Sequence, residues 1–165
     1  YCRADWDELT AEQLNLSAAV NISAPTLMIQ QMAMRSRETG EAGHAICVLS
    51  DSAYKLASRI AYLETKAGIG HGGRCLANLF SQQGVPFRVN SICPGLMDTE
   101  MAQTIPREQL EELLAQTRTG ALIPPADMAA NIMQMVRDDV MNGAVINYTN
   151  GFLPEADGVN LFAEQ

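Results

Sequence analysis

The sequence predicts an α/β fold with an open parallel sheet and helices on its faces. Segments with a helical period alternate with short apolar runs at 44–49, 87–92 and 143–148. The resulting order is helix, strand, helix, strand, helix, strand, which implies parallel strands joined by helical crossovers. The chain has 165 residues and shows neither an internal repeat nor a long linker. We therefore expect a single domain over residues 1–165.

The first helical segment begins at a capping box and contains a proline. Thr10-Ala11-Glu12-Gln13 has the pattern in which threonine and glutamine side chains cap the first turn. Helical periodicity then continues to about Arg37, with Pro25 inside it. Because Pro25 has no N–H, the carbonyl of Asn21 loses its usual helical partner. We expect either a kink whose free carbonyl can bind an ordered water, or simply a tolerated proline in a bent helix.

The later elements follow from similar patterns. The run His44–Leu49 is short and apolar, as expected of a strand buried on both faces. Pro106 and Pro125 are suited to first helical positions. The remaining expected elements are a helix at Ser58–Gln83, a strand at Phe87–Ile92, a helix at Ala126–Asp138 and a strand at Gly143–Tyr148. Three strands make a thin sheet, so an N-terminal part of it is expected to be absent.

Composition narrows the range of partners. The net charge is −8 and the 11 basic residues are scattered, which argues against nucleic acid or an anionic membrane as the main partner. No apolar run approaches the roughly 20 residues needed to span a bilayer. No signal peptide is visible, and the four cysteines lack Cys-x-x-Cys spacing, so we expect a cytoplasmic protein with reduced thiols. His44 and His71 are far apart in sequence, and a metal site is not expected.

Tyr62-Leu63-Glu64-Thr65-Lys66 is the most informative motif in the chain. Residues four apart lie on one face of a helix, so the Lys66 ammonium can stand beside the Tyr62 phenol. A cation held there stabilises the tyrosinate and lowers a phenol pKa that is about 10 in free solution. Such a phenol can transfer a proton at neutral pH, which carbonyl reduction and alcohol oxidation require.

Other polar residues are expected at the same edge of the sheet. Ligands of open α/β sheets bind beyond the carboxyl ends of the strands. Ser50 follows the first expected strand, and Pro94-Gly95 ends the second. A serine there can orient a substrate carbonyl or hydroxyl while Tyr62 moves the proton, although a lone serine is more commonly a capping residue.

The ordered set of these residues resembles the short-chain dehydrogenases/reductases. The residues that carry the resemblance are Asn21, Ser50, Tyr62 and Lys66, followed by Arg88-Val89-Asn90-Ser91-Ile92-Cys93-Pro94-Gly95, Thr99 and Gly151. The resemblance implies a Rossmann-like, doubly wound parallel sheet, apparently truncated at its N-terminal side. It also implies an oxidoreductase that moves a hydride between NAD or NADP and a small carbonyl or alcohol substrate.

The resemblance implies a role for each catalytic candidate. Tyr62 would be the general acid/base, and Lys66 would lower its pKa and hold the nicotinamide ribose. Ser50 would orient the substrate. The carbonyl of Asn21 would hold a water in a proton relay that reaches Lys66.

The resemblance also suggests where the cofactor and substrate would lie. Pro94, Gly95 and Thr99 would line the nicotinamide, with Thr99 at its carboxamide. Asn90 would be a structural turn residue rather than a catalytic one. The variable segment 96–124 carries apolar residues and would cover the substrate as a lid.

The sequence departs from the family pattern in several places. The family's glycine-rich dinucleotide loop and its Asn-Asn-Ala-Gly strand are absent, so the choice between NAD and NADP stays open. Ser50 is one residue closer to Tyr62 than is usual, which leaves Ser52 as an alternative. Asp51 is a weaker candidate, because pteridine reductases in the family can carry an aspartate near this position.

The helix after Lys66 is unusually rich in glycine. Each glycine costs up to about 1 kcal/mol relative to alanine in a helix interior. The expected compensation is close packing on the sheet or on a second subunit, at Gly68, Gly70, Gly72 and Gly73. In the family the two long helices commonly form a subunit interface, so a homo-oligomer, dimer or tetramer, is expected. The alternative function is a non-catalytic oligomerisation or interaction module.

Overall fold

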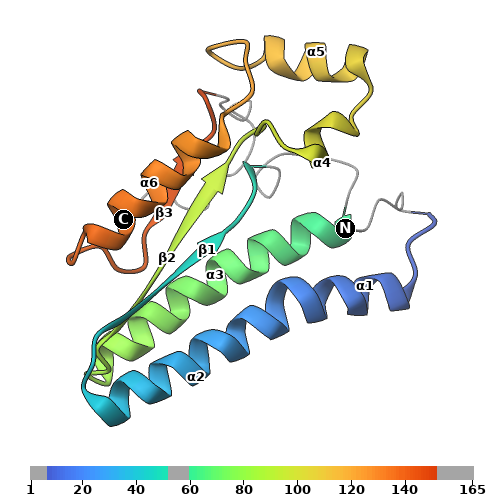
Figure 1. Ribbon diagram of the computed structural model, residues 1–165. Coiled ribbons are helices and arrows are strands. Elements are labelled where there is room, and N and C mark those ends of the chain that lie inside the picture. Colours follow the sequence, from blue (N-terminus) through green and yellow to red (C-terminus); the bar gives the residue numbers. More distant parts are fainter. Residues whose placement is uncertain (1–6, 52–59, 152–165) are drawn as a thin grey trace.

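The computed structural model describes residues 7–51 and 60–151, and these form an α/β fold (Figure 1). The three strands of its sheet lie in the order β1-β2-β3. They are β1 (Gly43–Val48), β2 (Phe87–Pro94) and β3 (Val145–Tyr148). Both neighbouring pairs are parallel, with Gly43 opposite Phe87 and Ser91 opposite Val145. The predicted α/β class with a parallel sheet is confirmed.

Helices alternate with the strands as the sequence predicts. They are α1 (Ala11–Ala18), the π-helical segment η1 (Ala19–Ser23), α2 (Ala24–Thr39), α3 (Ile60–Gln82), α4 (Glu100–Gln103), α5 (Arg107–Ala115) and α6 (Pro125–Arg137). The predicted capping box at Thr10 is present, with reciprocal hydrogen bonds to Gln13. Pro125 is the first residue of α6, whereas Pro106 lies one position earlier than predicted, as the N-cap of α5.

The helices cover the sheet in two layers (Figure 1). α2 and α3 pack on one face, where Ile29, Ile69 and Ala77 meet Leu49 and Val89 in a buried cluster. α6 packs on the other face through buried Met128 and Met135, which contact a cluster centred on Ile92. Alternate residues of β2 point to opposite faces, so one strand supplies both cores.

Within residues 7–51 and 60–151, no helix is both long and apolar enough to cross a membrane.

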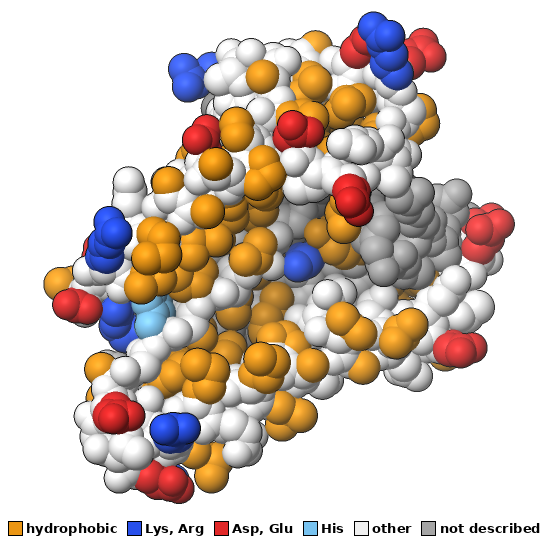
Figure 2. Space-filling model, in the orientation of Figure 1, with side chains coloured by type: hydrophobic (Ala, Val, Ile, Leu, Met, Phe, Trp, Pro, Cys, Tyr) orange, Lys and Arg blue, Asp and Glu red, His pale blue; other side chains and the backbone are white. Residues whose placement is uncertain are grey.

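β1 is less buried than the sequence predicts. Val48 is 46% exposed, and His44, Ala45 and Ile46 are only half-buried. Ala45 and Cys47 pack toward α2 and α3, so the alternate residues face the side where α6 covers β2 and β3. The prediction that this strand is buried on both faces is therefore wrong. Figure 2 shows further hydrophobic side chains on the surface over α2 and α6.

Close packing explains most of the glycines in α3. A Cβ at Gly70 would lie 2.8 Å from Leu49 Cδ1, and one at Gly73 would lie 3.3 Å from Val89 Cγ1. A Cβ at Gly68 would lie 3.0 Å from Ile22 in η1. Packing against the sheet and a neighbouring helix thus accounts for these three. A Cβ at Gly72 would have no neighbouring atom within 4 Å, so packing does not explain this glycine.

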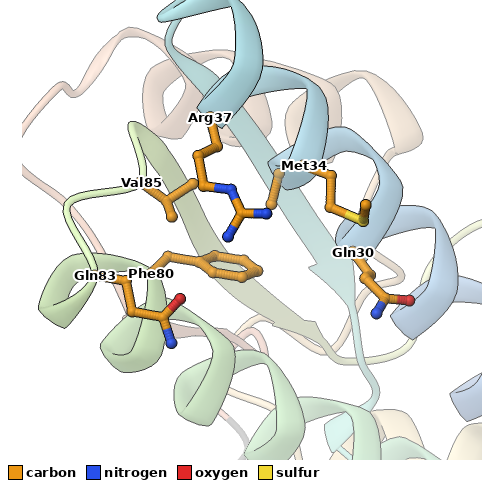
Figure 3. A pocket seen from close by; sticks show the side chains of 7 residues that line it. Gln30, Met34, Arg37, Phe80, Gln83 and Val85 are labelled. Atoms are coloured by element: carbon orange, nitrogen blue, oxygen red, sulfur yellow. The ribbon is translucent and has the colours of Figure 1, made fainter.

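A small hollow lies between the C-terminal parts of α2 and α3 (Figure 3). Figure 3 shows Arg37 reaching over the ring of Phe80, with Met34 and Gln30 at the side of α2. The volume of the hollow is about 60 Å³. A hollow of this size takes only a few water molecules. This hollow cannot hold a dinucleotide or a substrate.

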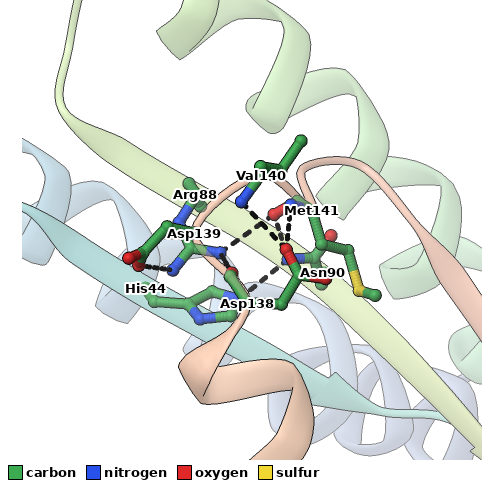
Figure 4. Close-up of polar contacts among 7 residues, drawn as sticks. All are labelled: His44, Arg88, Asn90, Asp138, Asp139, Val140 and Met141. Carbon is green, nitrogen blue, oxygen red and sulfur yellow. Dashed lines mark hydrogen bonds and ion pairs between the residues drawn. The ribbon is translucent and has the colours of Figure 1, made fainter.

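A polar cluster fills the space between the amino ends of the strands and the loop after α6 (Figure 4). Asn90 is 1% exposed, and its amide nitrogen donates to the Met141 carbonyl at 2.8 Å. Its Oδ1 accepts from the Ala144 N–H at 2.9 Å. The Arg88 guanidinium donates to the Asp138 and Met141 carbonyls. Asn90 is therefore a structural residue, as predicted, but it lies within a strand and not in a turn.

These bonds determine the protonation of His44. Asn90 Nδ2 lies 2.8 Å from His44 Nε2 and can only donate, so Nε2 must accept and neutral His44 carries its proton on Nδ1. That Nδ1 is buried and has no hydrogen-bond partner among the described residues. Burial lowers the pKa of His44, the Arg88 charge lowers it further, and Asp138 and Asp139 oppose this.

We predict that alanine affects stability in opposite directions at two neighbouring glycines of α3. Gly70→Ala forces its methyl group against buried Leu49, and we expect a net loss of about 1–2 kcal/mol in the free energy of unfolding. Gly72→Ala meets open space, and we expect a gain of up to about 1 kcal/mol from helix propensity. Urea denaturation of both variants measures this. Equal effects would contradict the packing described.

We also predict that His44 makes stability depend on pH. Its folded pKa is below the ordinary 6.5, so its contribution is fully present above about pH 6.5 and is lost as the pH falls toward the folded pKa. His44→Gln keeps an acceptor for Asn90 and should remove this component of the pH profile. Urea denaturation between about pH 7.5 and pH 5.5 measures it.

Candidate active site

The chain changes helix type at Asn21. η1 runs from Ala19 to Ser23, and the Ala24 N–H bonds back to the Ala19 carbonyl, five residues earlier. Pro25 follows in the first turn of α2 and supplies no N–H to the Asn21 carbonyl. A single π turn absorbs the mismatch without breaking the helix, as such bulges commonly do. The helix therefore departs from regular geometry at Asn21 as a π turn, and the free Asn21 carbonyl stays a prediction.

The π turn directs the Asn21 side chain toward α3. Asn21 Nδ2 donates to Thr65 Oγ1 at 3.2 Å, and Thr65 Oγ1 donates to the Tyr62 carbonyl at 2.9 Å. Thr65 is only 4% exposed. A continuous hydrogen-bonded chain therefore links Asn21 to the turn of α3 that carries Tyr62.

Lys66 connects α3 to the end of β1. Its Nζ donates to the Val48 carbonyl at 2.9 Å and lies 5.7 Å from the centroid of the Tyr62 ring. Burial lowers the pKa of Lys66, with neighbouring Cys47 acting in the opposite direction. Burial also raises the pKa of the Cys47 thiol, which favours its neutral form. The structure thus places Tyr62 and Lys66 on one helix face, at the carboxyl end of β1.

The serine candidates follow β1. Ser50 is half-buried and lies two residues beyond the last residue of the strand, at the edge where Lys66 meets Val48. Asp51 is 7% exposed. Ser52 lies outside the described residues, so Ser50 and Ser52 both stay candidates for the serine role.

The Pro-Gly segment ends β2 at the same edge. Pro94 is buried, and the Gly95 N–H donates to the Tyr148 carbonyl of β3 at 3.0 Å. A Cβ on Gly95 would come within 2.9 Å of the Thr149 carbonyl oxygen, so only glycine fits here. Thr99 is exposed and is the N-cap of α4. Pro94 is the last residue of β2, and Gly95 and Thr99 follow it, one strand away from the end of β1 where Lys66 bonds.

Thr65 was missed by the sequence analysis. It lies inside the Tyr62–Lys66 motif, on the side of α3 that faces Asn21. A threonine among helix-forming neighbours was the available signal, because its hydroxyl can bond to a carbonyl in the preceding turn. Asn150 was also not assigned a role, yet its amide donates to Thr119 and to the Ala121 carbonyl, tying the end of β3 to segment 96–124.

Comparison with known protein families identifies the family of this chain. Residues 2–152 match the family described as enoyl-(acyl carrier protein) reductase. The chain belongs to the short-chain dehydrogenase/reductase family. It is 26% identical over 155 residues to the 15-hydroxyprostaglandin dehydrogenase [NAD(+)] of Mus musculus, covering 88% of this chain and 55% of that protein. It is 26% identical over 152 residues to acetoacetyl-CoA reductase of Rhizobium meliloti, covering 90% and 62%.

Solved structures show the same fold. A 4-hydroxyisoleucine dehydrogenase complexed with NADH matches with a TM-score of 0.80 and 22% identity, over 90% of this chain and 63% of that one. A 2-deoxy-d-gluconate 3-dehydrogenase from Agrobacterium tumefaciens with bound NADP, described as putative, matches with a TM-score of 0.85 and 22% identity, over 92% and 63%. The fold of this short-chain dehydrogenase/reductase chain is therefore Rossmann-like. The chain spans only about half to two thirds of the length of these proteins.

We predict that Thr65→Val uncouples Asn21 from α3. The valine leaves the Asn21 amide without its acceptor, and we expect a loss of about 1 kcal/mol or more in the free energy of unfolding. Thr65→Ser retains the hydroxyl and should recover most of it. Thr104→Val removes an exposed hydroxyl that bonds to the Met101 carbonyl and should cost less than about 0.5 kcal/mol. Equal losses at Thr65 and Thr104, measured by urea denaturation, would exclude the link.

Proposed function

We propose that the protein that contains this chain is an NAD- or NADP-dependent oxidoreductase that interconverts a carbonyl and an alcohol, with Tyr62 as general acid/base. The observation that supports this most is the arrangement of Tyr62 and Lys66 at the carboxyl end of β1, with Asn21 linked through Thr65. Relatives named as NAD(+)-linked dehydrogenases and CoA-ester reductases support the same reaction class.

Lys66 is suited to two tasks in this reaction. Its ammonium has three protons, and the Val48 carbonyl accepts one of them. Two protons remain for the hydroxyls of a nicotinamide ribose or for a water. The same cation, next to the Tyr62 ring, stabilises the tyrosinate that forms when the phenol gives up its proton.

The residues around Lys66 fit a nicotinamide cofactor at this edge. NAD or NADP supplies the hydride chemistry when bound. Pro94 and Gly95, at the end of β2, would line the nicotinamide, and the packing of Gly95 against the Thr149 backbone makes that wall rigid. Thr99 would contact the carboxamide, and segment 96–124 would cover the substrate.

The proton path runs through this chain's own groups. The Tyr62 hydroxyl gives its proton to the substrate oxygen during reduction and takes it back during oxidation. The proton is replaced through Lys66 and a water held by the Asn21 carbonyl. Ser50, or Ser52 in its place, holds the substrate oxygen near Tyr62.

The second candidate function is an oligomerisation module, and it is favoured by exposed apolar residues on the α1–α2 layer. Leu16, Val20, Leu27 and Met28 are each more than half exposed. Exposed apolar surface of this kind is typical of interfaces. We propose that this layer joins a second copy of the chain. If the protein binds neither NADH nor NADPH, oligomerisation would be favoured as its whole function.

We predict that Tyr62→Phe abolishes most of the activity in the longest natural form of the protein. Loss of the phenolic proton should lower kcat by about 10²-fold or more, while the dissociation constant for NADH or NADPH changes less than about threefold. Steady-state kinetics and fluorescence titration measure the two effects. Turnover within a few-fold of the parent would overturn the role of Tyr62.

Tyr148→Phe is the matched control for this prediction. The Tyr148 ring packs with Ile92 and Met128 on the α6 side of the sheet, away from α3. Removing its hydroxyl should leave kcat within a few-fold of the parent. An equal loss in both variants would indicate general damage to the fold.

A further inference from the structure

The outward face of α3 carries a pair of metal-binding side chains. His71 and Cys75 are both exposed and one helical turn apart, and Cys75 Sγ lies 3.6 Å from His71 Nε2. Gly70 and Gly73, beside them in sequence, face the sheet. The pair therefore points away from the sheet and from the Tyr62–Lys66 face, so solvent ions can reach it.

The separation within this pair matches that of two ligands on one zinc ion. Zn²⁺ binds thiolate sulfur at about 2.3 Å and histidine nitrogen at about 2.0 Å in tetrahedral geometry. A tetrahedral angle between bonds of these lengths separates sulfur from nitrogen by about 3.5 Å. The observed 3.6 Å needs almost no rearrangement. A mixed nitrogen and sulfur pair also suits a borderline-soft cation better than Mg²⁺ or Ca²⁺.

We propose that His71 and Cys75 bind a zinc-type divalent cation, and that the same pair from a second copy of the chain completes the site. A closed zinc site takes four ligands, and no group of three or more potential metal ligands occurs among the described residues. A two-fold axis through the metal would supply the missing pair, giving two histidines and two cysteines.

The surroundings of the pair suit a second copy. Leu79, one turn after Cys75 on α3, is 45% exposed, and the neighbouring α2 exposes Leu27 and Met28. These apolar side chains would be covered when two α2–α3 layers meet face to face. The inference does not depend on the proposed reaction, because His71 and Cys75 lie outside the candidate active site.

The binding step is an exchange of a proton for a metal and involves no redox change. The Cys75 sulfur loses its proton to solvent as the S–Zn bond forms, and His71 binds through neutral Nε2. The hydrogen bond between Cys75 and His71 is replaced by the two bonds to the metal.

The test is a titration of the reduced, metal-free 165-residue chain with Co²⁺, a spectroscopic substitute for Zn²⁺. We expect a thiolate-to-cobalt charge-transfer band that saturates at one metal per two chains and is bleached by added Zn²⁺. Light scattering should show that the metal raises the share of dimer. Absence of the band, or saturation at one metal per chain with no change in mass, would overturn the shared site.

Single substitutions on the exposed helix face separate this site from incidental binding. Cys75→Ser should abolish the band, and His71→Gln should weaken Co²⁺ binding by at least about tenfold. Glu64→Gln removes a nearby exposed charge on the same helix and should leave binding unchanged. A band of full strength in Cys75→Ser, or undiminished affinity in His71→Gln, would assign the metal to other residues.

Discussion

The close approach of α3 to the sheet determines where the candidate functional side chains lie. Gly70 and Gly73 let the helix backbone come near Leu49 and Val89, and a Cβ at either position would press against one of these buried side chains. One turn before Gly70, Lys66 is consequently near enough to bond to the Val48 carbonyl at the end of β1. A helix held farther out would leave this lysine in solvent, without the burial that lowers its pKa.

The π turn at Asn21 is the second feature that shapes the site. Pro25 removes one backbone donor, and the wider turn of η1 accommodates that loss while rotating Asn21 toward α3. The Asn21–Thr65 bond then joins two helices that are far apart in the sequence. A local backbone irregularity thus becomes a tertiary contact beside Tyr62. This is a more specific arrangement than a proline merely tolerated in a bent helix.

Local signals in the sequence were sufficient for the order and type of the elements. The capping box at Thr10, the apolar runs and the proline at the start of α6 depend on neighbours only a few residues away, so they could be interpreted without tertiary information. The exposure of Val48 could not, because it depends on which strands α6 covers. Burial is a property of the assembled layers, and an apolar run alone does not show how many of its faces are covered.

The same limit applies to the candidate site. The Tyr62–Lys66 spacing predicted a shared helix face, but the roles of Thr65 and the Val48 carbonyl depend on contacts 44 and 18 residues apart in the sequence. Asn90 is a further case, since three partners from β1 and the loop after α6 meet at its amide. Such polar groups are fixed by the need to satisfy buried donors and acceptors, which a linear sequence does not reveal.

The two sites that we propose on α3 share one residue spacing. Tyr62–Lys66 and His71–Cys75 are both four residues apart, so each pair shares a helix face. The first pair lies against the sheet, where partial burial lowers the pKa of the lysine and a backbone carbonyl holds its ammonium in place. The second faces outward, where hydrated ions and a second copy of the chain can approach. The environment that the fold supplies, and not the spacing, is therefore the reason that we propose the first pair for proton transfer and the second for metal binding.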